Sequence, residues 1–272
     1  MSRFLKKDVT SLVLFNLFPG GKQNCVTFSF DDGNAQDKDV AKMLSARKMK
    51  ATFHLHNRTN MLLKDDFCEI YKDHEVACHG AKHVSINALS PSGKINEVMD
   101  NRRMLEGLLK SPVVGMSYAL GDFCDEAVET LKACGILYSR TVINTGNFRL
   151  PQDFYRWNPT CHVSSAFDIA KKFMQNINEH FSTPRLFYIW AHTHEMDDLD
   201  HFESFKELID LIDCPEKIWY ATNIEIYRYL TAIKQLEVSA DEKIIRNPTQ
   251  VDVWFNCDGE AKVVRAGETV YL

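Results

Sequence analysis

Apolar and polar residues alternate from Val26 to Phe30, which is the period of a β-strand. Two carboxylates and a glycine, Asp31, Asp32 and Gly33, follow this run directly. Farther along the chain, short apolar runs alternate with segments whose apolar residues recur every three or four positions, as in amphipathic helices. The pattern therefore predicts strand–helix units repeated along most of the chain.

The predicted elements alternate about seven times along the chain. We expect strands at 26–30, 50–56, 75–78, 113–118, 137–142, 185–191 and 217–221, and helices at 34–48, 61–71, 91–109, 122–134, 167–181, 202–212 and 224–236. In the long helix we expect one apolar face, formed by Ile95, Val98, Met99, Met104, Leu105 and Leu108. Because parallel strands need crossover connections, this order predicts an α/β fold with a parallel sheet closed into a barrel or nearly so.

The pattern changes near residue 237. Short β-like runs at 244–245, 251–255, 261–264 and 269–272 are separated by turn-forming pairs, and Asp258-Gly259 is typical of a hairpin. We therefore divide the chain into a barrel domain, 1–236, and a small β appendage, 237–272, packed on it. The apolar run 12–18 is too short to span a membrane, and we interpret it as an early strand or packing arm.

Composition narrows the classes of partner. The chain has 272 residues, with 45% hydrophobic and 25% charged residues and a net charge of -5. Without a Lys/Arg cluster, nucleic acid is not an expected partner, and we expect no membrane association. Eight cysteines occur without a C-x-x-C pair, which argues against a structural zinc knuckle and favours reduced thiols in a cytoplasmic protein.

The first candidate for chemistry is the pair Asp31 and Asp32. Catalytic groups collect at the C-terminal ends of strands in β/α barrels. Because neighbouring carboxylates repel each other, one is expected to bind a cation while the other handles protons. An ordinary strand-to-helix turn, with an aspartate as helix cap, explains the same residues equally well.

The second candidate is the pair His79 and His83, which also follows a predicted strand. A spacing of four residues places both imidazoles on one face of a helical turn, where they suit one divalent ion. Two unrelated surface histidines are the alternative. Since both candidate groups follow strand ends, we expect them on one rim, with a carboxylate as the third ligand.

These segments resemble the polysaccharide deacetylases with the NodB homology domain, carbohydrate esterase family 4. The run 28–33 is similar to that family's first motif, and 79–83 is similar to its second. Segments 117–122, 156–160 and 190–195 resemble later motifs in the expected order. The resemblance implies a distorted (β/α) barrel with one divalent ion, for which we expect zinc. By it, Asp32, His79 and His83 bind the ion and Asp31 is the general base.

The reaction that this resemblance implies is attack of water on an acetyl carbonyl. A three-ligand zinc keeps a position open for water and lowers the pKa of that water. A backbone N–H near Leu120 would stabilise the oxyanion. His192 is the candidate acid for the leaving group and His194 is the competing candidate. Strand periodicity does not choose between the two histidines, whereas the resemblance favours His192.

Four more residues are candidates for substrate binding or support. Tyr118 and Trp157 either line the acyl pocket or belong to the core. Arg156 either orients Asp31 or forms a surface ion pair. Glu195 either contacts substrate or supports the acid. The motifs also depart from the family pattern: Gly80 replaces Ser or Thr, Val84 replaces Pro, and Ala119-Leu120 replaces Pro-Tyr.

The sequence thus predicts a metal-dependent hydrolase that removes acetyl groups from N- or O-acetylated sugars. One alternative is an amidase that cleaves a C–N bond in a small amide other than a sugar. Another is a metal-holding carbohydrate-binding protein with little turnover, which the altered third motif suggests.

Overall fold

The computed structural model describes residues 12–272 as two compact units. The larger unit comprises Asn24–Glu179 and Arg185–Tyr227, and the smaller one comprises the described residues up to Gln23, His180–Pro184 and Arg228–Leu272. All the candidate site residues lie in the larger unit. The boundary predicted at residue 237, and the packing of the C-terminal segment on the barrel, stay predictions.

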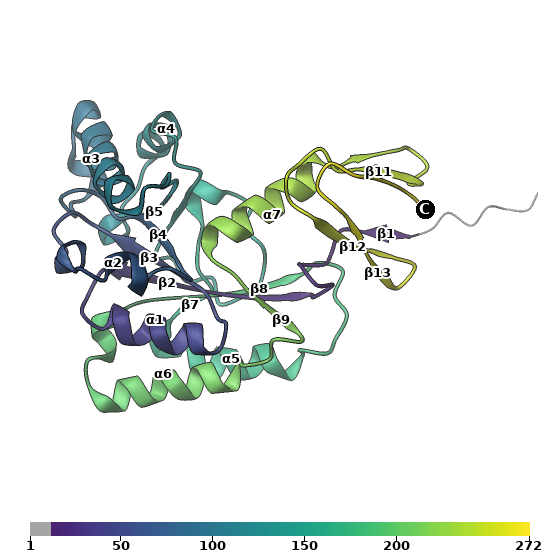
Figure 1. Ribbon diagram of the computed structural model, residues 1–272, viewed down its shortest axis with the longest axis horizontal. Helices are drawn as coiled ribbons and strands as arrows, with labels where there is room; N and C mark the ends of the chain where they lie inside the picture. Colours follow the sequence, from purple (N-terminus) through teal and green to yellow (C-terminus); the bar gives the residue numbers. More distant parts are fainter. Residues whose placement is uncertain (1–11) are drawn as a thin grey trace, which may run out of the picture. The chain divides into compact units, whose positions relative to one another are not determined.

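The larger unit is built on one parallel sheet that curls into a half-barrel (Figure 1). Its strands run in the order β6-β5-β4-β3-β2-β8-β7, and β9 pairs with β2 as well. Their bounds are β2 Asn24–Asp32, β3 Ala51–Leu55, β4 Glu75–Cys78, β5 Gly115–Ser117, β6 Tyr138–Arg140, β7 Cys161–His162, β8 Arg185–His192 and β9 Ile218–Tyr220. The predicted α/β fold is confirmed.

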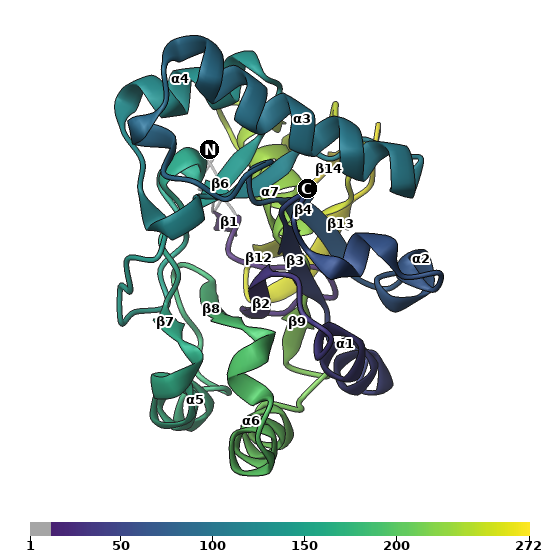
Figure 2. The ribbon, with the colours of Figure 1, turned by 90° about the vertical axis from the view of Figure 1, so that its left-hand side faces the viewer.

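Helices lie along the outside of the curled sheet (Figure 2). Their bounds are α1 Asp37–Ala46, α2 Phe67–Ile70, α3 Pro91–Leu109, α4 Asp125–Ala133, α5 Ala166–Gln175 and α6 Leu199–Leu211, and α7 Asn223–Gln235 runs across the boundary between the units. Short 3-10 turns complete the connections: η1 Asn60–Leu63, η2 Ile86–Ala88, η3 Ala119–Gly121, η4 Phe154–Arg156, η5 Val163–Ser165 and η6 Thr193–Met196.

Strand β2 organises the half-barrel because both of its faces are buried. On one face, Phe28 and Phe30 pack edge-on against Phe205 of α6, with centroids 5.9 and 6.0 Å away. On the other face, Ser29 and Asp31 are buried polar residues. Successive side chains alternate between the two faces of the strand. The apolar residues therefore pack against the helices, and the polar residues face the interior of the half-barrel.

Polar side chains therefore face the interior of the half-barrel at the C-terminal end of β2, and the candidate site lies there. β2 pairs along most of its length with β8, while β3 and β9 share its other edge. The register places Asp31 beside His54 on β3 and His192 on β8. These three side chains consequently reach the same end of the sheet.

Helix α3 differs from its predicted packing. Ile95 and Met104, which we expected on the buried face, are each 46% exposed, so this part of the prediction is wrong. Glu97 and Asn101 are buried in their place. Both side chains accept hydrogen bonds from backbone N–H groups of the loop that carries the candidate histidines. Hydrogen bonding by Glu97 and Asn101 and apolar burial of Val98 and Leu105 therefore together decide which face of α3 turns inward.

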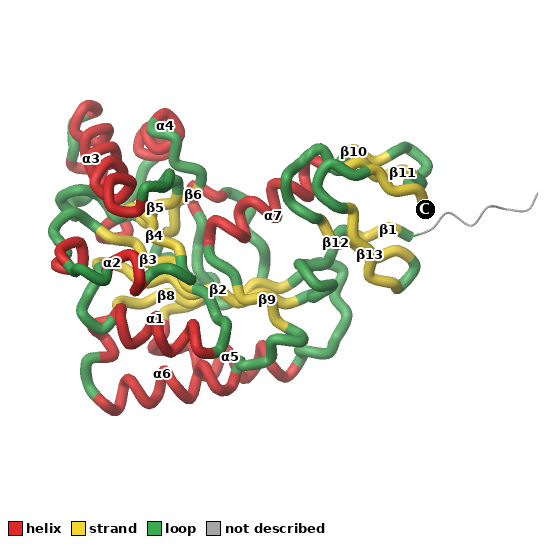
Figure 3. The backbone as a smooth tube through the Cα atoms, viewed as in Figure 1, coloured by secondary structure: helices red, strands yellow, loops and turns green. Residues whose placement is uncertain are grey.

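The smaller unit contains two three-stranded antiparallel sheets, drawn in yellow in Figure 3. Their strands are β1 Val13–Leu14, β10 Glu237–Val238, β11 Ile244–Arg246, β12 Val253–Cys257, β13 Glu260–Val264 and β14 Thr269–Tyr271. The predicted hairpin at Asp258-Gly259 joins β12 to β13, and both residues have the positive φ that this turn needs. No helix among residues 12–272 is long and apolar enough to cross a bilayer.

Candidate active site

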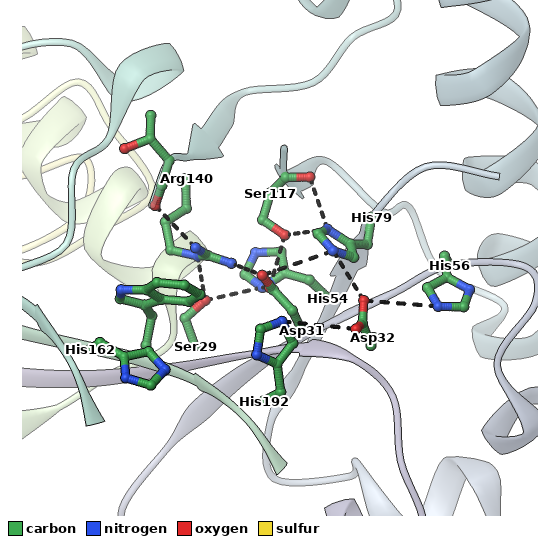
Figure 4. A network of polar contacts seen from close by, with 12 residues as sticks. Ser29, Asp31, Asp32, His54, His56, His79, Ser117, Arg140, His162 and His192 are labelled. Carbon is green, nitrogen blue, oxygen red and sulfur yellow. Dashed lines mark hydrogen bonds and ion pairs between the residues drawn. The ribbon is translucent and has the colours of Figure 1, made fainter. Parts of the chain in front are cut away.

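The candidate residues gather where the strands end. β2 contributes Asp31 and Asp32, β3 is followed by His56, the loop after β4 carries His79 and His83, and β8 ends at His192. Figure 4 shows most of these side chains turned toward one another, with Ser117 and Arg140 from β5 and β6 behind them. Asp32 takes a positive φ of 75°, which aspartate tolerates better than most residues.

Asp32, His79 and His83 form a compact three-atom cluster. Asp32 Oδ1 lies 3.3 Å from His79 Nε2 and 3.2 Å from His83 Nε2. Ligand bonds of about 2.0–2.1 Å in a tetrahedral zinc site place neighbouring ligand atoms roughly 3.3 Å apart. The three atoms are therefore spaced as ligands of one small divalent ion.

The hydrogen bonds of His79 show which of its nitrogens is available. Nδ1 lies 2.7 Å from Ser117 Oγ and 3.1 Å from the Ser117 carbonyl oxygen. A nitrogen facing a carbonyl carries the proton, so Nε2 presents a lone pair toward Asp32. Asp32 Oδ1 is itself buried without a hydrogen-bond partner. A cation satisfies this arrangement, and the residues present fit a divalent ion.

The histidine pair is brought together by a loop rather than a helical turn, so that part of the prediction is wrong. Gly80 and His83 have positive φ values of 83° and 54°. Asn101 Oδ1 accepts from His79 N at 2.8 Å, and Glu97 Oε1 accepts from Lys82 N at 2.7 Å. These bonds fix the loop so that both imidazoles face Asp32.

Asp31 lies directly behind this cluster. Arg140 Nη2 donates to its Oδ2, and Ser117 Oγ donates to its Oδ1 at 3.0 Å. Burial opposes ionisation of Asp31, but the Arg140 charge and the hydrogen bond that Arg140 donates outweigh it and hold the pKa well below its usual range. Asp31 is thus an ionised carboxylate beside the cluster.

The expectation that Arg156 orients Asp31 is wrong. Arg156 pairs instead with Asp153 and Asp125, each at 2.5 Å, which is the surface alternative. Arg140 takes the orienting position from the end of β6, and its side chain is wholly buried.

His192 is held by Glu195. His192 Nδ1 lies 2.8 Å from Glu195 Oε1, and the His192 backbone N–H donates to the same oxygen at 2.8 Å. The hydrogen bond to Glu195 raises the pKa of His192. His192 Nε2 lies 3.8 Å from Asp32 Oδ2, whereas His194 is exposed in η6. The geometry therefore places His192 at the site, supported by Glu195.

His162, Glu195 and His192 form a second group that could hold a metal ion. Here the atoms are already paired through protons. Ser164 N donates to His162 Nδ1, so His162 Nε2 carries a proton and donates to Glu195, 3.1 Å from Oε1. Glu195 accepts from both imidazoles, and we interpret this group as a hydrogen-bonded support.

Three other predicted residues bring no side chain to the site. Tyr118 is 1% exposed and its hydroxyl donates to the Tyr155 carbonyl, so it belongs to the core rather than to an acyl pocket. Trp157 is also 1% exposed and packs against Tyr188. Leu120 has a positive φ of 60° and an exposed side chain, which leaves only its backbone as a candidate for the site.

Sequence reasoning missed several residues of this network. They are His54, His56, Ser117, Arg140 and His162. The spacing of His54 and His56 at the end of the predicted strand 50–56 was the available signal, because alternate residues share one face.

Comparison with known proteins agrees with the predicted family. Residues 19–139 match the model of the polysaccharide deacetylase family. The protein YxkH of Bacillus subtilis, whose name places it among the polysaccharide deacetylases, is 23% identical over 124 residues, which are 42% of this chain and 43% of YxkH. The chain thus spans less than half the length of that curated relative.

Solved structures share the fold. A Mycobacterium smegmatis protein named as a polysaccharide deacetylase superposes with a TM-score of 0.61 at 14% identity, covering 80% of this chain and 93% of that one. Peptidoglycan deacetylase PdaC from Bacillus subtilis gives 0.53 at 16% identity, covering 78% and 95%.

Proposed function

We propose that the protein is a metal-dependent hydrolase of the polysaccharide deacetylase family that removes acetyl groups from N- or O-acetylated sugars, because residues 19–139 match the model of that family. The observation that carries the proposal is the placement of an ionised Asp31 directly behind the Asp32–His79–His83 cluster. Asp31 stays outside the proposed ligand set for proton transfer, while Asp32 belongs to it.

The proposed ligands are Asp32 Oδ1 and the Nε2 atoms of His79 and His83. A bound zinc or similar divalent ion would supply Lewis acidity at the acetyl carbonyl and lower the pKa of the attacking water. This chemistry needs a group that takes the proton from water and another that returns a proton to the leaving group.

Asp31 is the proposed base. Arg140 and Ser117 hold its carboxylate in one orientation, so that its proton-accepting oxygen does not depend on side-chain motion. His192 is the proposed acid and delivers a proton from Nε2 to the leaving amine or alkoxide, while Glu195 holds its Nδ1. The backbone N–H of Leu120 is the proposed donor to the oxyanion.

The substrate class is proposed from the family. Hydrolysis of an amide in a small molecule other than a sugar is the alternative, because the same groups serve any acyl transfer from nitrogen. We also propose a cytoplasmic location, on the cysteine pattern of the sequence.

Acetate release from a panel of acetylated sugars and small amides tests the proposal. We expect metal-dependent release by the wild type from a sugar, about 10²-fold or more slower turnover in Asp31→Asn, and loss of bound metal in His83→Ala. Circular dichroism controls for folding. Metal binding without release from any acetylated compound would favour a carbohydrate-binding protein, and release from non-sugar amides alone would favour the amidase.

A further inference from the structure

His56 is a further imidazole beside the proposed ligand set. It follows β3 directly, and its ring centroid lies 5.0 Å from that of His83. His56 Nε2 lies 3.9 Å from Asp32 Oδ1, the oxygen that faces His79 and His83. Its side chain is only 14% exposed. On residue type alone, His56 would be counted as a fourth metal ligand, although it lies outside the three-atom cluster.

The hydrogen bond on the far side of the ring argues otherwise. The backbone N–H of Arg58 donates to His56 Nδ1 at 3.1 Å, so Nδ1 holds the lone pair. In a neutral imidazole the proton is then on Nε2. His56 therefore presents an N–H toward Asp32, whereas His79 presents a lone pair because its Nδ1 donates to Ser117.

A connection between two loops holds this arrangement. Arg58 Nη1 donates to the Lys82 carbonyl oxygen at 3.2 Å, and Lys82 immediately precedes His83. The turn that fixes the His56 ring is thus tied to the loop that carries a proposed ligand. For His56 Nε2 to bind a metal, Nδ1 would have to carry a proton pointing at the Arg58 N–H.

We propose that His56 is a positioning residue: its Nε2–H donor faces the Asp32 carboxylate and its ring packs on His83, and it does not bind the metal. This rests on the proposed function, in which one coordination position must stay open for reaction. Four protein ligands would complete a tetrahedral zinc site of the structural kind. The tautomer of His56 keeps the ligand set at three, while its Nε2–H dipole, 3.9 Å from Asp32 Oδ1, favours the ionised form of the ligating carboxylate.

The first test is ¹⁵N NMR of the histidine side chains in the metal-free and the zinc-loaded protein. We expect His56 Nε2 to keep its proton in both states and Nδ1 to remain unprotonated. Loss of the Nε2 proton on zinc loading would overturn the proposal, because it identifies His56 as a ligand. No substrate is present, so inactivity toward every acetylated sugar would leave this result intact.

A pair of variants gives the second test. His56→Gln keeps an N–H donor at a similar reach, whereas His56→Phe keeps a ring of similar size without the donor. We expect His56→Phe to weaken zinc binding about 10–100-fold and His56→Gln to recover most of that loss, with one ion bound throughout. His201→Gln, an exposed position on α6, is the control and should bind zinc as the wild type does.

Equal zinc affinity in His56→Phe and wild type would overturn the proposal, since ring packing alone would then suffice. Equal losses of zinc affinity in His56→Phe and His56→Gln would also overturn the proposal. They would indicate that His56 binds the metal, because the amide N–H of glutamine can replace a hydrogen-bond donor but not an imidazole ligand.

Discussion

Arg140 Nη2 donates to Asp31 Oδ2 where both side chains are almost wholly buried, 0% and 3% exposed. A buried carboxylate stays ionised only if charges or hydrogen bonds compensate for lost solvation. Arg140 supplies a charge at the bottom of the site, where it touches Asp31 but lies behind the proposed ligands. Asp31 is thereby kept ionised without being neutralised by the metal.

Replacing Arg140 should affect both stability and pH dependence. Arg140→Met leaves the Asp31 charge uncompensated, so we expect unfolding free energy at pH 7 to fall by about 3–5 kcal/mol. The stabilisation from the depressed pKa of Asp31 is present above its unfolded pKa of about 3.9 and is lost as pH falls through the folded value. Urea unfolding of the wild type and Arg140→Met at several pH values measures this stabilisation.

The loss of the Arg140 charge should also change the pH dependence of catalysis. The pKa of Asp31 rises, so the acid limb of the kcat/KM profile should move to higher pH. Arg156→Met removes exposed ion pairs and is the matched control, with a change in stability within about 1 kcal/mol and an unchanged profile. A profile that shifts equally in both variants would argue against the assignment of Arg140.

Asp32→Asn should change stability in opposite directions with and without metal. In the metal-free protein, Asp32 Oδ1 has no hydrogen-bond partner although imidazole nitrogens of His79 and His83 lie 3.3 and 3.2 Å away, and an amide can donate to the lone pair of His79. Asparagine also tolerates the positive φ at this position. We expect Asp32→Asn to match or exceed wild-type stability without metal, by thermal unfolding, and to lose most of the stabilisation that zinc gives the wild type. A variant less stable than the wild type in both states would contradict this account of the cluster.

The positions of the site residues at strand ends were predictable because the alternation of apolar and polar residues marks where each predicted strand ends. Asp31 and His79 come directly after predicted strands, and those strands exist. Arg140 was not predictable in the same way, since alternation shows that a strand has a polar face without showing whether that face meets water or a polar interior. His162 depends on tertiary partners that no local pattern encodes.

In helix α3 the bounds were predictable from the sequence, but the buried polar residues were not. Its length was predicted to the residue, because its apolar period and its Pro91 start are local signals. Its buried face was predicted only in part: Val98 and Leu105 are buried as expected, whereas Glu97 and Asn101 also turn inward to accept hydrogen bonds from the loop at His79–Lys82. Hydrophobic periodicity takes account only of apolar residues, so it predicts that a face carrying Glu97 and Asn101 is exposed to solvent.

Asp37, at the start of α1, should make stability depend on pH. Burial raises the pKa of this carboxyl to about 6, although Tyr71 and Thr193 each donate to it at 2.5 Å. With an unfolded pKa of about 3.9, the protonated form stabilises the fold fully below about pH 4, and this contribution is lost as pH rises through 6.

Asp37→Asn removes this dependence because its amide is neutral throughout. We expect the stability of Asp37→Asn relative to the metal-free wild type to rise by roughly 2 kcal/mol between pH 4 and pH 7. Urea unfolding at both pH values measures the difference. Asp39→Asn, at an exposed position of the same turn, should show no such rise. A constant difference for Asp37→Asn would mean that folding does not raise the pKa of this carboxyl.

Gly80 and Glu97 should be energetically coupled. A Cβ at Gly80, whose φ is 83°, would lie 2.7 Å from Glu97 Oε1, the oxygen that accepts from Lys82 N. Gly80→Ala should therefore lower stability through both backbone strain and displacement of this carboxylate. Glu97→Ala removes the contact but leaves the Lys82 N–H without its acceptor.

A double-mutant cycle separates the two causes. Strain from the positive φ remains whichever residue occupies position 97, whereas the steric contact disappears with the carboxylate. We expect the double variant to be more stable than the sum of the single losses by about 1 kcal/mol or more. Zinc affinity should follow the same pattern, because the loop between His79 and His83 moves with the carboxylate. Additive losses would place the whole cost of Gly80→Ala in the backbone and leave Glu97 as an independent support of the loop.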